Sequence, residues 1–175
     1  MVGIFSSLSL VFLLLATTSY AVPVSHVTLI CQGTLNPSFC SSLLKNQNES
    51  YFHIAQYTLD VARANVTNTI NLIKKLIAHS TKDPTEKTHF RSCLYSFGPN
   101  GVLGDINYAH FLFKRKEYEA MSVAIASIQS DIDDCTKRKS PSDAPYHDPS
   151  QLSKYIHVVE LVANVILIFA KYLVP

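Results

Sequence analysis

Four cysteines are the residues whose type and spacing indicate defined chemistry. They lie at Cys31, Cys40, Cys93 and Cys135. A structural zinc site would need closely paired ligands such as CxxC or HxxxH, and the chain contains neither pattern. The seven histidines are scattered singly along the sequence, so we expect no metal site. Disulfide formation then becomes the expected chemistry of the thiols, provided that the chain folds in an oxidising compartment.

The N-terminal segment indicates that compartment. Residues 1–21 carry no charged side chain, contain the apolar run VFLLLA, and end in Ser19-Tyr20-Ala21, with small residues at the two positions that signal peptidase reads. The apolar run is shorter than the ~20 residues of a membrane span. We therefore expect a signal peptide over 1–21, a secreted mature chain over 22–175, and two disulfides for which three pairings are open.

Three aspartates, Asp131, Asp133 and Asp134, look like a fragment of a calcium-binding loop. An EF-hand needs glycine at the sixth position and glutamate at the twelfth, and neither follows. On a helical wheel Ser127, Ser130, Asp131 and Asp134 form one polar stripe beside the apolar seam. A solvated helix face is the simplest interpretation, and a contact surface for a partner's cleft is the alternative.

No catalytic residues can be assigned. The chain lacks GxSxG, HExxH and any local Ser-His-acid signature, and its five glycines form no phosphate-binding loop. A net charge of +2 is too balanced for a protein that binds nucleic acid by neutralising phosphates. We expect no enzyme activity, no cofactor and no nucleic-acid partner.

A helical framework is predicted for everything beyond residue 50. With 175 residues, 47% hydrophobic and 16% charged, the chain has the size and composition of one packed domain. Its apolar residues recur at spacings of three and four, which is the period of a helix face. The four seams are Phe52, Ala55, Leu59, Ala62, Val66, Thr69, Ile73 and Leu76; Phe90, Cys93, Leu94, Phe97, Leu103, Ile106, His110 and Phe113; Tyr118, Met121, Ile125, Ile128, Ile132 and Cys135; and Leu152, Tyr155, Val159, Val162, Ile166, Phe169 and Leu173.

Prolines and glycines mark three breaks along these seams. Asp83-Pro84 ends the first helix, the Gly98–Gly101 stretch bends the second, and a proline-rich loop follows the third. The fold class is therefore all-α, an antiparallel four-helix bundle over 50–175. The last helix is apolar enough to raise the question of a membrane segment, but its heptad spacing favours a buried helix that closes the bundle, so we expect no membrane contact after signal removal.

A short helical hairpin is predicted to precede the bundle over 22–47. The segment between Cys31 and Cys40 contains Asn36-Pro37, a turn signal between two helix-capable arms. A bond between these two cysteines would close the hairpin. Cys93 and Cys135 would then tie the second bundle helix to the third.

In order and spacing, these features resemble the plant invertase and pectin methylesterase inhibitor family over the whole mature chain. The elements that carry the resemblance are the signal peptide; Cys31-x8-Cys40 with Asn36-Pro37 and Phe39 inside it; a third cysteine opening a bundle helix; Lys116-Glu117-Tyr118, leading through Ala120, Ala126 and Ser127 to Asp133-Asp134-Cys135; a proline-rich loop; and an apolar last helix. Members usually run a continuous helix beyond the third cysteine, whereas this chain has Tyr95, Gly98, Pro99 and Gly101 there.

The resemblance implies a hairpin followed by a four-helix bundle, disulfides from first to second and third to fourth cysteine, no catalytic activity, and a partner enzyme in the plant cell wall or vacuole. Invertase inhibitors often carry Pro-Lys-Phe where this chain has Lys116-Glu117-Tyr118, which favours pectin methylesterase over invertase as that partner. Ser127, Ser130, Asp131 and Asp134 are the expected partner-facing residues.

Three functional classes follow, and an inhibitor that blocks an enzyme's substrate cleft is the first. The second is a module that binds acidic pectin, because protonation of all seven histidines would raise the formal charge from +2 to +9. The third is a structural relative without a partner.

Two acceptor sequons for N-glycosylation occur in the mature chain. They are Asn48-Glu49-Ser50 and Asn65-Val66-Thr67. Asn48 precedes the first bundle helix and is the preferred site, whereas Asn65 falls inside that helix, where a glycan fits only on the outer face.

Overall fold

The structure of this protein is a computed structural model that describes residues 24–47, 50–80, 83–137 and 148–174. The expected signal peptide, Asn48 and most of the proline-rich loop lie outside these ranges.

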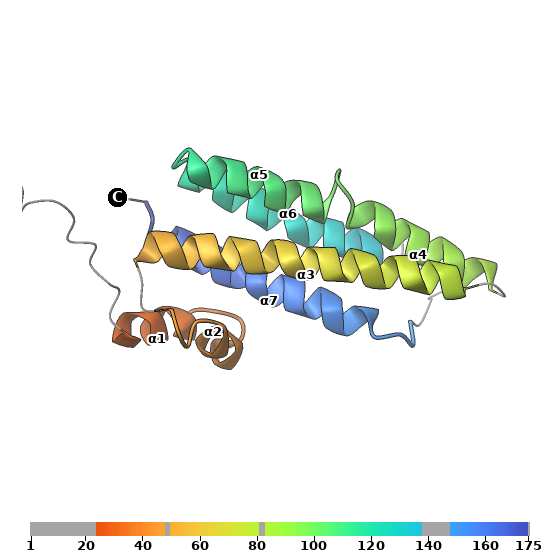
Figure 1. Ribbon diagram of the computed structural model, residues 1–175, viewed down its shortest axis with the longest axis horizontal. Helices are drawn as coiled ribbons and strands as arrows, with labels where there is room; N and C mark the ends of the chain where they lie inside the picture. Colours follow the sequence, from red (N-terminus) through yellow and green to blue (C-terminus); the bar gives the residue numbers. More distant parts are fainter. Residues whose placement is uncertain (1–23, 48–49, 81–82, 138–147, 175) are drawn as a thin grey trace, which may run out of the picture.

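The all-α four-helix bundle predicted from the apolar period is confirmed (Figure 1). Throughout the described ranges the regular elements are helices: α1 Val24–Gln32, α2 Pro37–Leu43, α3 Tyr51–His79, α4 Pro84–Ser96, α5 Val102–Lys114, α6 Tyr118–Thr136 and α7 Leu152–Ala170. The four rods of the bundle are α3, the bent pair α4 and α5, α6, and α7, while α1 and α2 form a hairpin beside α7 (Figure 1).

Most seam residues are buried, but two assignments are wrong. Phe52 and Tyr155 are each 40% exposed, and the buried positions are Ile54 and Ile156 instead. Ile54 faces the small core under the α1–α2 hairpin, which the bundle period does not include. Phe52 instead stacks on Phe113 with ring centroids 4.5 Å apart, at the rim of the core.

The third cysteine also lies elsewhere along its helix than expected. Asp83 caps the N-terminus of α4 by accepting hydrogen bonds from the backbone N–H groups of Thr85 and Glu86, and Pro84 occupies the first turn. The helix therefore begins at Pro84, nine residues before Cys93. Cys93 sits in the last turn of α4 rather than opening a helix.

Close backbone contacts produce the bend between α4 and α5. A Cβ atom on Gly101 would lie 1.9 Å from the Ser96 carbonyl oxygen, and one on Gly104 would lie 2.2 Å from the Pro99 carbonyl oxygen. Only glycine fits at both places. Phe97 and Val102 flank the bend and are fully buried, so the chain changes direction without leaving the core.

The reversal between α5 and α6 is equally compact. Lys116 has φ of 61°, its N–H donates to the Phe113 carbonyl at 2.9 Å, and the Glu117 N–H donates to the Leu112 carbonyl at 3.0 Å. These two bonds are those of a Schellman cap, with lysine at the left-handed position that glycine usually occupies. The cap turns the chain directly into α6 and places the two helices side by side.

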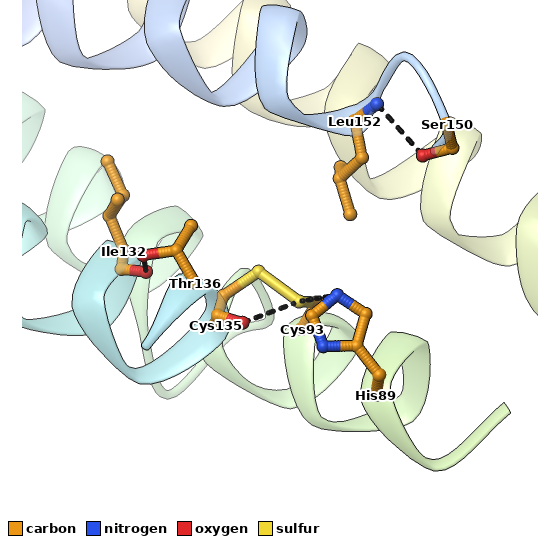
Figure 2. The surroundings of a disulfide bond; sticks show 7 residues. All are labelled: His89, Cys93, Ile132, Cys135, Thr136, Ser150 and Leu152. Atoms are coloured by element: carbon orange, nitrogen blue, oxygen red, sulfur yellow. Dashed lines mark hydrogen bonds between the residues drawn. A yellow bond between two sulfur atoms is a disulfide. The ribbon is translucent and has the colours of Figure 1, made fainter. Parts of the chain in front are cut away.

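The two disulfides pair Cys31 with Cys40 and Cys93 with Cys135, at Cα–Cα distances of 5.4 and 4.3 Å. This is the pairing that the family resemblance implies. The first bond closes the α1–α2 hairpin. The second joins α4 to the end of α6, and Figure 2 shows it crossing between the two helices beside His89.

The hairpin is attached to α7 by a small apolar core and one polar contact. Ile30, Leu44, Val165 and Phe169 are buried between the hairpin and the bundle. The Asn164 carboxamide oxygen accepts a hydrogen bond of 2.8 Å from the backbone N–H of residue 35. Asn164, a polar residue in the apolar helix α7, thus helps to attach the hairpin to the bundle.

Among the described helices, α7 is the one that is long and apolar enough to span a membrane. Half of the residues in its most apolar stretch are buried inside the bundle, and it packs against both α3 and α6. It is the buried closing helix that its heptad spacing predicts.

We expect Gly101→Ala to lower the free energy of unfolding by about 2–4 kcal/mol, because the new Cβ would clash with backbone that lies inside a packed core. Gly33→Ala is the matched control, since its Cβ would lie 3.3 Å from the nearest atom and the neighbour needs to move only slightly. Denaturant unfolding of both variants checks this, and equal stability of the two would contradict it.

The Cys93–Cys135 bond should stabilise the protein more than the Cys31–Cys40 bond, because it closes the longer loop. The chain-entropy estimate is about 4 kcal/mol for the longer loop and about 2.7 kcal/mol for the shorter. Thermal unfolding of the Cys93→Ala, Cys135→Ala and Cys31→Ala, Cys40→Ala double variants measures the difference. A larger loss from the hairpin pair would reverse the ranking.

Candidate functional site

The predicted polar stripe forms part of the surface of α6. Ser127, Ser130 and Asp134 are exposed, and Asp131 is partly buried. Ile128 and Ile132 between them are in the core, so the stripe follows the boundary of the buried seam as the helical wheel predicts. That this stripe faces a partner stays a prediction.

Contacts across the helix pair extend the stripe onto α5. The Ser127 hydroxyl donates a 2.6 Å hydrogen bond to Oδ2 of Asp105, and the Asp131 carboxyl also hydrogen-bonds the Asp105 carboxyl. Asp134 is close enough to Asp131 to act on it electrostatically. We call Asp105, Asp131 and Asp134 the carboxyl cluster.

The carboxyl cluster holds a proton at mildly acidic pH. Partial burial, the charge of Asp105 and the hydrogen bond to it, and the charge of Asp134 together raise the pKa of Asp131 to about 6. Two carboxylates in contact cannot both ionise without repulsion, so one of them keeps its proton until the pH approaches neutrality. The cluster therefore changes charge between mildly acidic and neutral pH.

Asp133 does not belong to this cluster, although it belongs to the same sequence triplet. Lys137 and Gln129 donate hydrogen bonds to its carboxylate, at 2.5 and 3.3 Å. The bond from Lys137 holds the pKa of Asp133 below its ordinary value. The triplet thus separates into Asp133, which is paired along the helix, and Asp131, which contacts Asp105 of α5 and feels the charge of Asp134.

Asp105 is the member of the site that the sequence reasoning missed. A signal for it exists, because Asp105 and Ser127 lie equally far in sequence from Lys116, the residue at the reversal. In an antiparallel helix pair joined by a tight turn, such residues come opposite each other. The prediction required the position of the reversal, and the sequence did not mark it with a glycine or proline.

Two histidines are held by packing rather than being free to gain charge in acid. Burial lowers the pKa of His89 and, together with the charge of Arg63, that of His110. His110 Nε2 lies 3.6 Å from Oδ1 of Asp60, between α5 and α3. These two side chains therefore resist the protonation that the full rise in charge to +9 requires.

The glycosylation sequon inside α3 is structurally constrained. Asn65 is half-buried, and its Nδ2 donates a 2.9 Å hydrogen bond to the Val61 carbonyl. A glycan attached to this nitrogen would have to leave the helix surface in competition with that bond. The preference for Asn48 over Asn65 stays a prediction.

No group of three or more histidine, cysteine, aspartate or glutamate side chains is placed to hold a metal ion in the part of the chain that the structure describes. The carboxyl cluster can form hydrogen bonds and can change its charge with pH, and both properties can serve the recognition of a partner.

Comparison with known sequences identifies the chain's relatives. The family model described as plant invertase/pectin methylesterase inhibitor matches residues 25–168. Pectinesterase inhibitor 1 of Arabidopsis thaliana is 29% identical over 161 residues, which cover 89% of this chain and 90% of the relative. The pectinesterase inhibitor of Actinidia deliciosa is 22% identical and covers 98% and 94% of the two chains.

Solved structures agree on the fold. A mutant form of a pectin methylesterase inhibitor from Arabidopsis superposes with a TM-score of 0.69 at 23% identity, covering 83% of this chain and 95% of that one. A second pectin methylesterase inhibitor from Arabidopsis thaliana gives a TM-score of 0.60 at 22% identity, over 86% and 97% of the chains. With its hairpin, its bundle and a family model that spans most of its length, this chain belongs to the plant invertase/pectin methylesterase inhibitor family, whose members are enzyme inhibitors rather than enzymes.

Proposed function

We propose that this protein inhibits plant pectin methylesterase by forming a stoichiometric, non-covalent complex that blocks the substrate cleft. The observation that carries the proposal is the match along nearly the whole chain to two curated pectinesterase inhibitors. The absence of a recognisable catalytic motif in the sequence is consistent with it.

The architecture suits an inhibitor that binds as a rigid body. Two disulfides and a core that runs through all four rods leave little backbone freedom to lose when the surface docks. Ser127, Ser130, Asp131 and Asp134 lie on a helix whose two ends are fixed, by the Schellman reversal and by the bond to Cys93. We propose that these four side chains contact the enzyme.

Invertase is the alternative target. The segment that favours the esterase, Lys116-Glu117-Tyr118, is the α5–α6 reversal itself, and it borders a shallow depression of about 370 Å³ lined also by Ala120 and Val174. A proline in place of Lys116 could not adopt its φ of 61°. The Pro-Lys-Phe form of this segment would therefore need a different reversal, which would change the surface presented there.

The proposal includes secretion into the apoplast, with the vacuole as the alternative compartment. The warrant is the N-terminal segment together with two disulfides, which persist in oxidising compartments. Attraction to acidic pectin is a weaker, additional proposal, since burial keeps His89 and His110 from contributing their full charge.

Reversing two charges on α6 tests the surface. The Asp131→Lys, Asp134→Lys double variant should inhibit pectin methylesterase at least about tenfold more weakly than the wild type, because it removes acceptor groups from the interface. Inhibition constants for the esterase and for an acid invertase, measured from mildly acidic to neutral pH, give the comparison.

The control is an Asp133→Lys, Glu160→Lys double variant, which makes the same change in net charge outside the carboxyl cluster. Equal inhibition by wild type and the Asp131, Asp134 variant would remove the surface assignment. Inhibition of invertase without inhibition of the esterase would remove the functional one.

The raised pKa of Asp131 predicts a pH dependence of stability. Its folded value of about 6 lies above the ordinary value, so the stabilising proton is fully bound below about pH 4 and is lost as the pH rises through 6. Asp131→Asn removes this titration while keeping the shape of the side chain. We expect the variant to be more stable than wild type at pH 7 and to lose that advantage near pH 4, as measured by thermal unfolding. A stability difference that is constant between these pH values would contradict the shared proton.

A further inference from the structure

Two aromatic side chains are exposed on α5, beside the carboxyl cluster. Tyr108 and Phe111 are 55% and 54% exposed. They lie on the side of α5 opposite Ile106, Ala109 and Phe113, which belong to the core. The packing of the bundle therefore does not account for these two rings.

The rings form an ordered arrangement with one cation. Their planes differ by 14° at a centroid distance of 6.2 Å, and the Arg115 guanidinium lies 5.4 Å from the Phe111 ring centroid. Arg115 is in turn held by an ion pair of 2.5 Å from its Nε to Oε1 of Glu117. We call Tyr108, Phe111 and Arg115 the aromatic ladder. Side chains that are already ordered lose little entropy when a partner covers them.

The aromatic ladder continues the carboxyl cluster along α5. Asp105 precedes Tyr108 by three residues, so the two side chains are neighbours on the helix surface. Asp105 is anchored to Ser127 of α6, which ties the ladder to the predicted partner-facing stripe. Both α5 and α6 lie on the side of the bundle away from the α1–α2 hairpin (Figure 1).

The carboxyl cluster and the aromatic ladder form one strip across α5 and α6, and this strip combines the chemical features of pectin. Partly methyl-esterified polygalacturonate carries free carboxylates, ester methyl groups and the apolar faces of sugar rings along one chain. A cleft that accepts it must provide cationic or hydrogen-bond-donating groups for the carboxylates and apolar surface for the rest. The carboxyl cluster presents carboxyl groups, as pectin does, and the aromatic ladder presents apolar surface directly beside them.

We propose that the aromatic ladder is the apolar anchor of the complex with pectin methylesterase, occupying the part of the substrate cleft that packs against esterified sugars, while the carboxyl cluster occupies the adjoining positions for free carboxylates. This inference rests on the proposed function. Tyrosine and arginine, together with tryptophan, are enriched among the residues that dominate binding energy at interfaces, where aromatic side chains anchor the complex by filling pockets on the partner.

The test is inhibition of a panel of purified plant pectin methylesterases by the full-length mature protein and a Tyr108→Ala, Phe111→Ala double variant. The double variant should inhibit at least about 30-fold more weakly, which is the loss expected from one binding hot spot. A Tyr108→Phe, Phe111→Tyr variant keeps both rings and should inhibit within about threefold of wild type. Circular dichroism and thermal unfolding should show that both remain folded, because the substituted side chains lie outside the core.

A Leu29→Ala, Leu35→Ala variant is the matched control, since these two apolar side chains are 64% and 77% exposed on the hairpin. It should inhibit as wild type does. Undiminished inhibition by the Tyr108, Phe111 double variant, or an equal loss in the hairpin control, would overturn the assignment of the ladder while leaving the proposed function intact. Failure of the wild type to inhibit any esterase in the panel would overturn both.

Discussion

The bond between Cys93 and Cys135 holds the end of α6 against α4, and the surface of α6 depends on that attachment. Asp131 lies one turn before Cys135, so the crosslink anchors the same turn of α6 that carries Asp131 and Asp134 of the carboxyl cluster. At its other end α6 begins directly after the Schellman reversal at Lys116. A helix fixed at both ends can slide or rotate little against α5. The contact between Ser127 and Asp105 is a consequence of that register.

The bend at Gly101 gives the second rod two separate tasks. Its first half, α4, is crosslinked to α6 through Cys93, whereas its second half, α5, carries Asp105 and the aromatic ladder. A straight helix would continue the direction of α4, and the close contact of Gly101 with the Ser96 carbonyl redirects α5 instead. The departure from the family's continuous helix therefore falls between the structural half of the rod and the half that we propose to bind the enzyme.

The sequence was sufficient for the helices, because burial of one helix face imposes a period that survives in a single chain, but it did not mark the reversal between α5 and α6. The burial of α7 was predictable for the same reason, the bend at Gly98–Gly101 was predictable from its glycines and proline, and the pairing of the cysteines followed from the family resemblance. Phe52 and Tyr155 were misassigned because helix ends meet other elements, here the hairpin core at Ile54, that the period cannot represent. Asp105 was missed because its partners come from α6, and pairing between helices depends on the exact position of a turn.

The energetics of the carboxyl cluster argue that it is not there to stabilise the fold. Partial burial and the neighbouring carboxyl groups together raise the pKa of Asp131 to about 6, so at neutral pH the folded protein carries a cost of ionisation that the unfolded chain avoids. Asparagine could keep the shape and the hydrogen bonding without that cost. The aromatic ladder has the same character, since exposed Tyr108 and Phe111 contribute little to the core. Groups that are unfavourable or idle in the free protein are often retained for binding, because a partner can offset the cost of ionisation and cover the apolar rings. Both groups lie on one strip across α5 and α6, which is why we assign them to one interface.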